Sequence, residues 1–207
     1  MNIIAHRRNT IVELEQTPTC YGVEVDIRSC GDRLIIHHDP YVPGEDFIRW
    51  LAAYRHGTLI LNVKEEGLES RLIALMQQFG IADFFFLDQS FPFLVKWSQN
   101  GERRCAVRVS EFESLETALA LSGKVDWVWV DCFSRFPLSA NDAARLKNAG
   151  FRLCLVSPEL QGREPEKEIP ALRALLAARN IAANAVCTKR PDLWEMPAPK
   201  ANKAVFS

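Results

Sequence analysis

A regular alternation of two kinds of segment along the chain limits its possible folds more than any other feature of the sequence. Nine short runs rich in β-branched and aromatic residues predict strands, at 2–6, 21–28, 33–38, 58–64, 84–88, 104–110, 127–132, 151–157 and 184–188. Between them, apolar residues recur about every 3.6 positions and predict helices at 68–79, 140–149, 169–179 and, more weakly, 45–54. Strands that alternate with helices favour a parallel sheet, and this number of units favours a barrel over an open sheet. We therefore expect an α/β fold, a single compact (β/α)₈ TIM barrel.

Nine strands are one more than such a barrel holds, and the run at 33–38 is the extra one. It follows the run at 21–28 after a turn at 29–32, which is too short for the crossover helix that parallel strands need. This run is predicted to form a short hairpin-like addition after the second strand. The 207 residues are expected to make one domain with an irregular C-terminal tail at 192–207.

The charge balance and the apolar segments exclude several classes of partner. A formal net charge of -1 provides no basic field, so the expected partner is a small molecule and not a nucleic acid. No apolar stretch is long enough for a signal peptide or a membrane span. The six cysteines show no metal-binding spacing, which is typical of buried thiols in a reducing compartment. We expect a cytoplasmic location, and the sequence leaves the oligomeric state open.

Two carboxylates on the second predicted strand form the first candidate site. Glu24 and Asp26 are two residues apart, so both project from the same face of the strand, opposite its apolar residues. Like charges at this spacing repel each other unless a cation lies between them. Oxygen ligands of this kind suit Mg²⁺ or Ca²⁺. The alternatives are a solvated strand face or an ion pair with Arg28.

Further polar side chains stand where other predicted strands end, at the rim where barrels of this type carry out chemistry. Asn62 and Lys64 close the run at 58–64, where an amide oxygen can complete a metal shell and an ammonium can hold a phosphoryl oxygen. The first strand ends in His6–Arg7, and the hairpin run ends at His38. A lone histidine is more often structural, but histidines at two separate strand ends beside a carboxylate pair favour a functional role.

Two residues at other strand ends are candidates for substrate contact. Trp129 shares a strand face with Asp131 and either packs on a substrate or fills the barrel. Glu159 lies in the loop after the run at 151–157, where it either contacts substrate hydroxyls or is solvated.

The order of these motifs resembles that of the glycerophosphodiester phosphodiesterase family over nearly the whole chain. The family begins with His-Arg after the first strand, followed by Glu-x-Asp, an apolar run closing in His-Asp, Glu-x-Lys, Ser-Phe and Thr-Asp-Arg-Pro. The matching segments here are His6–Arg7, Glu24–Asp26, Leu34–Asp39, Asn62–Lys64, Ser90–Phe91 and Thr188–Pro191.

The resemblance implies a role for each matched residue. His6 and His38 are implied as the acid–base pair, and Arg7 and Lys64 as cations that neutralise the phosphate. The implied ligands of a divalent metal ion, Mg²⁺ or Ca²⁺, are Glu24, Asp26 and Asn62. In the family, a neighbouring hydroxyl of the substrate attacks phosphorus, one histidine takes its proton, and the other protonates the leaving alkoxide.

The chain departs from the family pattern at its metal shell and next to its first histidine. Asn62 stands where the family has a Glu, which removes one negative charge from the shell, and Arg8 replaces a Gly. These changes leave three functions to be weighed. The first is a metal-dependent phosphodiesterase that hydrolyses a glycerophosphodiester-like substrate. The alternatives are a barrel that binds a phosphate ligand without turnover and a lyase that releases a cyclic phosphodiester.

Overall fold

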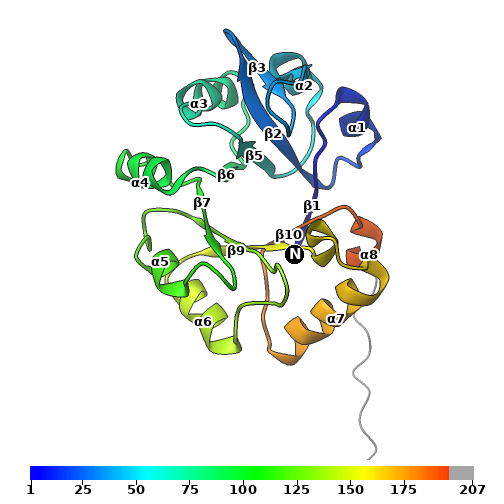
Figure 1. The fold of residues 1–207 in the computed structure, drawn as a ribbon, viewed down its shortest axis with the longest axis vertical. Coiled ribbons are helices and arrows are strands. Elements are labelled where there is room, and N and C mark those ends of the chain that lie inside the picture. The colour runs from blue at the N-terminus through cyan, green and yellow to red at the C-terminus, as the bar shows by residue number, and fades with distance from the viewer. Residues whose placement is uncertain (196–207) are drawn as a thin grey trace, which may run out of the picture.

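The computed structural model of the chain describes residues 1–195, whose strands form one curled sheet with helices around it (Figure 1). The strands are β1 (Asn2–Ala5), β2 (Gly22–Cys30), β3 (Arg33–Ile36), β4 (Glu45–Asp46), β5 (Leu59–Val63), β6 (Phe84–Leu87), β7 (Ala106–Val109), β8 (Trp127–Val130), β9 (Arg152–Val156) and β10 (Ala185–Thr188). The helices are α1 (Ile11–Gln16), α2 (Phe47–Ala53), α3 (Glu69–Gln78), α4 (Phe91–Gln99), α5 (Leu115–Leu119), α6 (Ala140–Asn148), α7 (Pro165–Ala178) and α8 (Pro191–Glu195), with a short 3₁₀ helix η1 (Pro158–Gln161).

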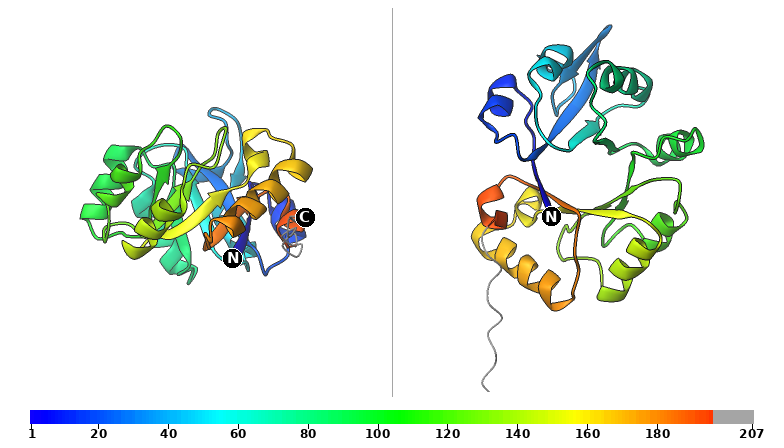
Figure 2. Two further views of the ribbon diagram at one scale, coloured as in Figure 1. Left: turned by 90° about the horizontal axis from the view of Figure 1, so that it is seen from below. Right: turned by 180° about the vertical axis from the view of Figure 1, so that it is seen from behind.

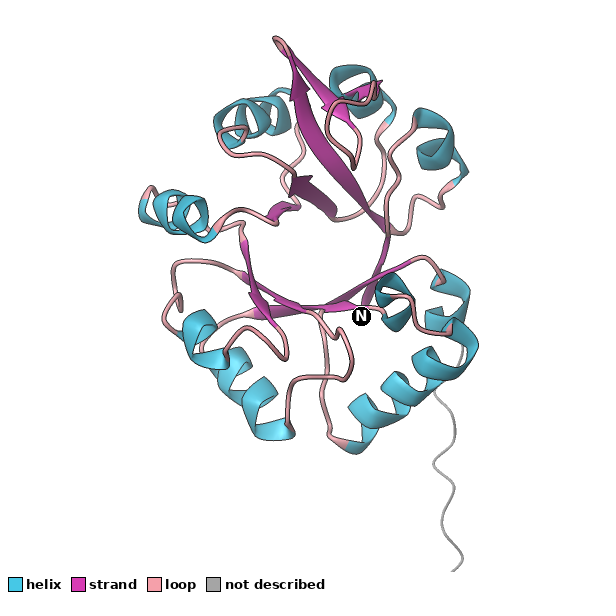
Figure 3. Ribbon diagram, viewed as in Figure 1, coloured by secondary structure: helices cyan, strands magenta, loops and turns pink. Residues whose placement is uncertain are grey.

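Parallel pairing runs through most of the sheet. From β6 it continues through β5, β2, β1, β10, β9 and β8 to β7. The two ends of this run, β6 and β7, meet at one isolated parallel bridge between Phe86 and Cys105. The parallel strands therefore curl around a common interior, with the helices outside (Figure 3). The predicted α/β architecture with a parallel sheet is confirmed, and regular pairing is interrupted between β6 and β7.

The hairpin predicted after the second strand is present. β3 pairs antiparallel with the end of β2, with Ile27 opposite Ile36 and Cys30 opposite Arg33. The two-residue strand β4 then pairs antiparallel with β3 and was not predicted from the sequence. It is too short to show an alternating pattern.

Four predicted helices are present, and four others were missed. The runs predicted at 68–79, 140–149 and 45–54 correspond to α3, α6 and α2, and α7 begins four residues before the predicted 169. Helices α1, α5 and α8 span six residues or fewer, which is less than the window over which helical periodicity is recognisable, and the longer α4 was missed as well. Short helices of this kind depend on their caps, as at Thr10, whose side chain accepts a hydrogen bond from the Glu13 N–H.

The prediction of an irregular tail at 192–207 is wrong for its first residues. Helix α8 covers Pro191–Glu195 and buries Trp194, whose Nε1 donates a hydrogen bond to Ser157 Oγ at 2.8 Å. One buried aromatic side chain is enough to dock a single helical turn, although it creates no periodic signal. Residues 196–207 lie outside the described part of the chain.

Apolar side chains pack on both sides of the curled sheet. The larger cluster lies between the sheet and the helices and includes Val23, Val25 and Ile27 of β2. The smaller cluster fills the interior of the curl and includes Trp127 and Trp129 of β8. Because residues alternate along β2, Glu24 and Asp26 belong to the interior side, as predicted. The view from behind in Figure 2 shows the helices outside the strands from the opposite direction.

The described residues include no helix that is both long and apolar enough to cross a membrane. All six cysteines are free, and four of them are buried, namely Cys105, Cys132, Cys154 and Cys187.

Candidate active site

Glu24 is the third residue of β2, and two neighbouring elements hold its side chain. Its Oε2 accepts a hydrogen bond from the Arg7 backbone N–H at 2.7 Å, and its Oε1 accepts one from Asn62 Nδ2 at 2.8 Å. Arg7 adopts a left-handed backbone with φ 51°, which turns its N–H toward the carboxylate. Burial, together with the charge of Asp26, raises the pKa of Glu24.

Asp26 is completely buried and is surrounded by cationic and amide groups. Arg7 Nε lies 3.4 Å from its Oδ2, and Lys64 Nζ lies 3.2 Å from its Oδ1. The Asn9 side chain donates to Asp26 Oδ2 at 2.8 Å and accepts from the Asp26 N–H at 3.1 Å. Two opposite charges therefore compensate the carboxylate, as a buried charge requires.

Asn62 lies beside both carboxylates and has an unused oxygen. Asn62 lies opposite Asp26 in the pairing of β5 with β2, and its side chain is buried. The amide nitrogen donates to Glu24, whereas the amide oxygen Oδ1 is buried without a hydrogen-bond partner among the described residues. A buried carbonyl oxygen without a hydrogen-bond donor lowers the stability of the fold unless another group interacts with it.

His6 approaches the same carboxylates from the end of β1. Its Nε2 lies 3.9 Å from Glu24 Oε2, and its Nδ1 is buried with no hydrogen-bond partner within residues 1–195. Burial, with the charges of Arg7 and Lys189, lowers the pKa of His6 to about 3, so the imidazole is neutral at pH 7. The sequence prediction that His6, Arg7, Glu24, Asp26, Asn62 and Lys64 meet at one end of the sheet agrees with these contacts.

His38 is placed less tightly. Its Nδ1 lies 2.7 Å from Asp39 Oδ1, and its side chain is 42% exposed. Within residues 1–195, no hydrogen bond or ion pair joins it to Glu24, Asp26 or His6. His38 and Arg7 line the same cavity of about 830 Å³, and His6 is not among the residues that line it.

The two predicted substrate contacts have other partners. Trp129 is 5% exposed and belongs to the interior cluster. The Glu159 carboxylate accepts hydrogen bonds from the Thr188 hydroxyl, the Lys189 N–H and Ser157 Oγ. Their contact with a substrate stays a prediction, and the geometry favours barrel filling for Trp129 and loop positioning for Glu159.

A line of alternating charges extends the site beyond the predicted residues. Lys64 Nζ lies 3.2 Å from Asp88 Oδ2, and Arg108 pairs with Asp88 and, at 3.3 Å, with Asp131 Oδ2. The sequence signal available for Asp88 and Asp131 is their position directly after β6 and β8, since polar residues at strand ends face the rim. The order Asp26, Lys64, Asp88, Arg108, Asp131 thus spans β2, β5, β6, β7 and β8.

The donor set fits a hard divalent cation in its chemistry. Two carboxylates and an amide oxygen are the ligand types that Mg²⁺ and Ca²⁺ take. Asn62 Oδ1 and Asp26 Oδ1 are both buried without a hydrogen-bond partner in the described structure, and both lie next to Glu24 or Lys64. The described residues include no group of three acidic, histidine or cysteine side chains arranged for a metal, because the third position here is an amide.

No family model matches this chain, and no curated protein matches its sequence. Its fold is similar to a glycerophosphodiester phosphodiesterase from Agrobacterium tumefaciens str. C58, with a TM-score of 0.63 at 15% identity over 94% of this chain and 97% of that chain. It is also similar to a glycerophosphoryl diester phosphodiesterase from Parabacteroides distasonis, with a TM-score of 0.61 at 12% identity over 93% of this chain and 84% of that chain.

A tryptophan synthase from M. tuberculosis has a TM-score of 0.54 at 12% identity, over 90% of this chain and 81% of that chain. The resemblance predicted from the motifs is therefore confirmed for the fold. Because one fold can carry unrelated chemistries, the function has to be argued from the site.

Proposed function

We propose that this protein is a metal-dependent phosphodiesterase that hydrolyses a glycerophosphodiester-like small molecule. The observation that carries the proposal is the meeting of five side chains: Glu24 and Asp26 from within β2, His6 from just past the end of β1, and Asn62 and Lys64 from the end of β5. These residue types, in a fold shared with glycerophosphodiester phosphodiesterases, match the needs of phosphodiester cleavage.

In this proposal, the oxygens of Glu24, Asp26 and Asn62 hold a divalent metal ion, Mg²⁺ or Ca²⁺. When bound, such an ion neutralises charge on the phosphoryl oxygens and lowers the barrier to attack. The unpartnered Asn62 Oδ1 supports its assignment as the third ligand.

Arg7 and Lys64 provide further positive charge toward the phosphate. Both cations form ion pairs with Asp26. The Arg7 side chain is 41% exposed, so Arg7 can reach a ligand in the cavity that it lines. A phosphodiester anion repels nucleophiles, and fixed cations reduce that repulsion without reorganising.

His6 and His38 act as the acid–base pair. A hydroxyl of the substrate attacks phosphorus and gives its proton to one imidazole, and the other imidazole protonates the departing alkoxide, which leaves a cyclic phosphodiester. In a second step water attacks the phosphorus of this ring and gives a proton to one imidazole. The ring oxygen leaves with a proton from the other imidazole, so that a linear phosphomonoester is formed. His6 directly follows β1 and His38 follows β3, and Arg7, the neighbour of His6, lines the same cavity as His38, which supports separate roles for the two imidazoles.

We also infer that the parallel strands of the curled sheet form a closed (β/α)₈ barrel around this site. The single bridge between Phe86 and Cys105 supports closure, and the ion pair between Asp88 and Arg108 joins the same two strands near their carboxyl ends.

Phosphorus NMR of glycerophosphoethanol with Mg²⁺, Ca²⁺ or Mn²⁺ tests the proposal. We expect hydrolysis to a linear phosphomonoester, and a loss of about 10²–10⁴ in kcat for His6→Ala and for His38→Ala. The matched control is His56→Ala, because His56 lies away from these residues and contacts the Thr17 carbonyl.

Each other result of this assay decides against the proposal in a different way. A cyclic phosphodiester as the final product would establish the lyase alternative. Absence of turnover with all three metals would favour the barrel that binds a phosphate ligand without catalysis.

A further inference from the structure

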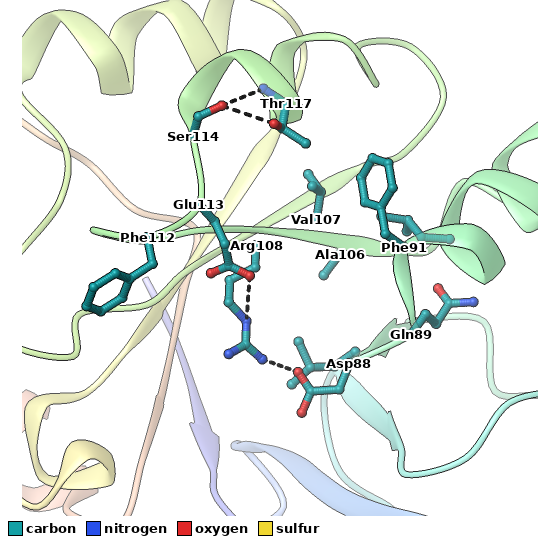
Figure 4. A pocket seen from close by; sticks show the side chains of 12 residues that line it. Asp88, Gln89, Phe91, Ala106, Val107, Arg108, Phe112, Glu113, Ser114 and Thr117 are labelled. Atoms are coloured by element: carbon teal, nitrogen blue, oxygen red, sulfur yellow. Dashed lines mark hydrogen bonds and ion pairs between the residues drawn. The ribbon is translucent and has the colours of Figure 1, made fainter.

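A groove opens beside the candidate site, at the place where β6 and β7 are joined by a single bridge (Figure 4). Because regular pairing is interrupted there, helices α4 and α5 stand apart on its two sides. The groove has a volume of about 610 Å³, within the range of small-molecule sites. It is lined by the ends of β6 and β7 and by residues of α4 and α5.

One side chain, that of Lys64, links the candidate site to a residue that lines the groove. Lys64 Nζ lies 3.2 Å from Asp26 Oδ1 on one side and 3.2 Å from Asp88 Oδ2 on the other. Asp88 lines the groove and adopts a left-handed backbone with φ 60° directly after β6. Asp88 therefore belongs both to the groove and to the line of ion pairs that begins at Asp26.

The charges of the groove decide which kind of arm fits. Arg108 is the one lysine or arginine among the described residues that line it. Its guanidinium pairs with Asp88 and Asp131 and lies 3.9 Å from Glu113 Oε1. Among the residues that line the groove, the carboxylates of Asp88 and Glu113 outnumber the one cation, Arg108, and Lys64 pairs with Asp88 from the side of the candidate site. The groove therefore disfavours an anionic arm.

Apart from these charges, the groove is lined by six apolar side chains and by the polar Gln89, Ser114 and Thr117. Leu87, Leu94 and Val107 form its buried walls. Phe91 and Phe112 line it as well and are 51% and 82% exposed. Exposed aromatic side chains beside a cavity gain stability when a ligand covers them, since apolar area is removed from water.

We infer that this groove binds the alcohol arm of the phosphodiester, and that the arm is uncharged and apolar, an alkyl or aryl group. The inference rests on the proposed function, because it takes the phosphodiester to lie at Glu24, Asp26 and Lys64. It adds a specificity that none of the predicted site residues explains.

The test compares glycerophosphodiesters that differ only in one arm, namely methyl, hexyl and 5-carboxypentyl. We expect kcat/KM for the hexyl ester to exceed that for the methyl ester about tenfold, since added methylenes are discriminated to this extent. The 5-carboxypentyl ester is expected to lose that advantage. The double variant Phe91→Ala/Phe112→Ala should reduce the hexyl-to-methyl ratio to near one. Ile48→Ala, which removes an apolar side chain on α2 that is about as exposed as Phe91, should keep the wild-type ratio.

The outcomes separate this inference from the proposed function. Turnover of all three esters at equal kcat/KM would overturn the groove assignment and leave the phosphodiesterase proposal intact. If no ester is hydrolysed, the phosphodiesterase proposal fails. The groove assignment is then tested by calorimetry, which compares the dissociation constants of the hexyl and methyl esters. Equal affinities for the methyl and hexyl esters would then overturn the groove assignment, and circular dichroism verifies that each variant is folded.

Discussion

The residue that distinguishes this site from the family pattern is Asn62. Glu24 and Asp26 are buried carboxylates, and the cations Arg7 and Lys64 both lie against Asp26. Glu24 has a backbone N–H and the Asn62 amide as its donors, so its charge is less fully compensated. An amide at this position lets Glu24 share a hydrogen bond where a third carboxylate would repel it.

Asn62→Glu is expected to lower stability without metal by about 3 kcal/mol, because it adds an unpaired buried charge. It should also tighten the binding of Mg²⁺ or Ca²⁺ about tenfold, because one more carboxylate raises the charge of the shell. Calorimetric titration measures the affinity, and thermal unfolding with and without metal measures the stability. Asn148→Glu, the same change at an exposed position on α6, is the control. If the metal affinity of Asn62→Glu equals that of wild type, Asn62 is not a ligand.

At the scale of elements, Glu111 connects two loops at the rim of the sheet. Its carboxylate accepts hydrogen bonds from the backbone N–H groups of Phe133, Ser134 and Arg135, so it ties the loop after β7 to the loop after β8. This places Phe133 beside Phe112 of the groove, with ring centroids 5.8 Å apart. The loop contacts therefore depend on one ionised carboxylate.

Burial alone would raise the pKa of Glu111, but the N–H donors of Arg135 and Ser134 outweigh it and lower the pKa from 4.5 to about 2. A depressed folded-state pKa stabilises the protein above pH 4.5, and this contribution is lost as the pH falls from 4.5 to about 2. We expect Glu111→Gln to lower the free energy of unfolding by about 1 kcal/mol at pH 7, allowing for solvent screening.

Urea unfolding of wild type and Glu111→Gln between pH 2 and 7 measures this difference, which should shrink toward zero at the acid end. Glu116→Gln serves as the control, because Glu116 makes one exposed pair with Arg145 and no such set of backbone contacts. A difference that stays constant across the pH range would contradict the role of the Glu111 charge.

At the scale of the whole molecule, the extent of backbone pairing between neighbouring strands differs around the curled sheet. β2 and β5 are paired over five residues, whereas β6 and β7 share one bridge. The ion pair between Asp88 and Arg108 joins the two strands beyond that bridge. Local opening is easiest where few backbone hydrogen bonds have to be broken together.

Hydrogen exchange is expected to show this unevenness. The free energy of opening that allows hydrogen exchange should be smaller for the backbone amides of β7 than for those of β5. β5 pairs over several residues with a strand on each side, whereas β7 pairs in this way with a strand on one side. Native-state exchange followed by mass spectrometry measures both segments in one experiment. Equal protection of β5 and β7 would show that the ring is closed as firmly at β6 and β7 as elsewhere.

Much of this arrangement was predictable because it depends on local patterns. The nine predicted strands all correspond to observed ones, since each carries an apolar run bounded by turns. The positions of Glu24 and Asp26 on the interior face followed from alternation along one strand. The short helices, β4 and the turn of helix at 191–195 could not be predicted, because their stability comes from caps and from single buried side chains such as Trp194.

The sequence by itself determined which faces of the strands are apolar and which polar residues stand at strand ends, because both depend on spacing along the chain. Only the tertiary structure decided which of those polar residues meet. It brought Lys64 between Asp26 and Asp88 and left His38 paired with Asp39. It also opened a groove between β6 and β7. Contacts between strands distant in sequence depend on how the sheet curls and where its pairing is interrupted, and the curl is a property of all the strands packed together.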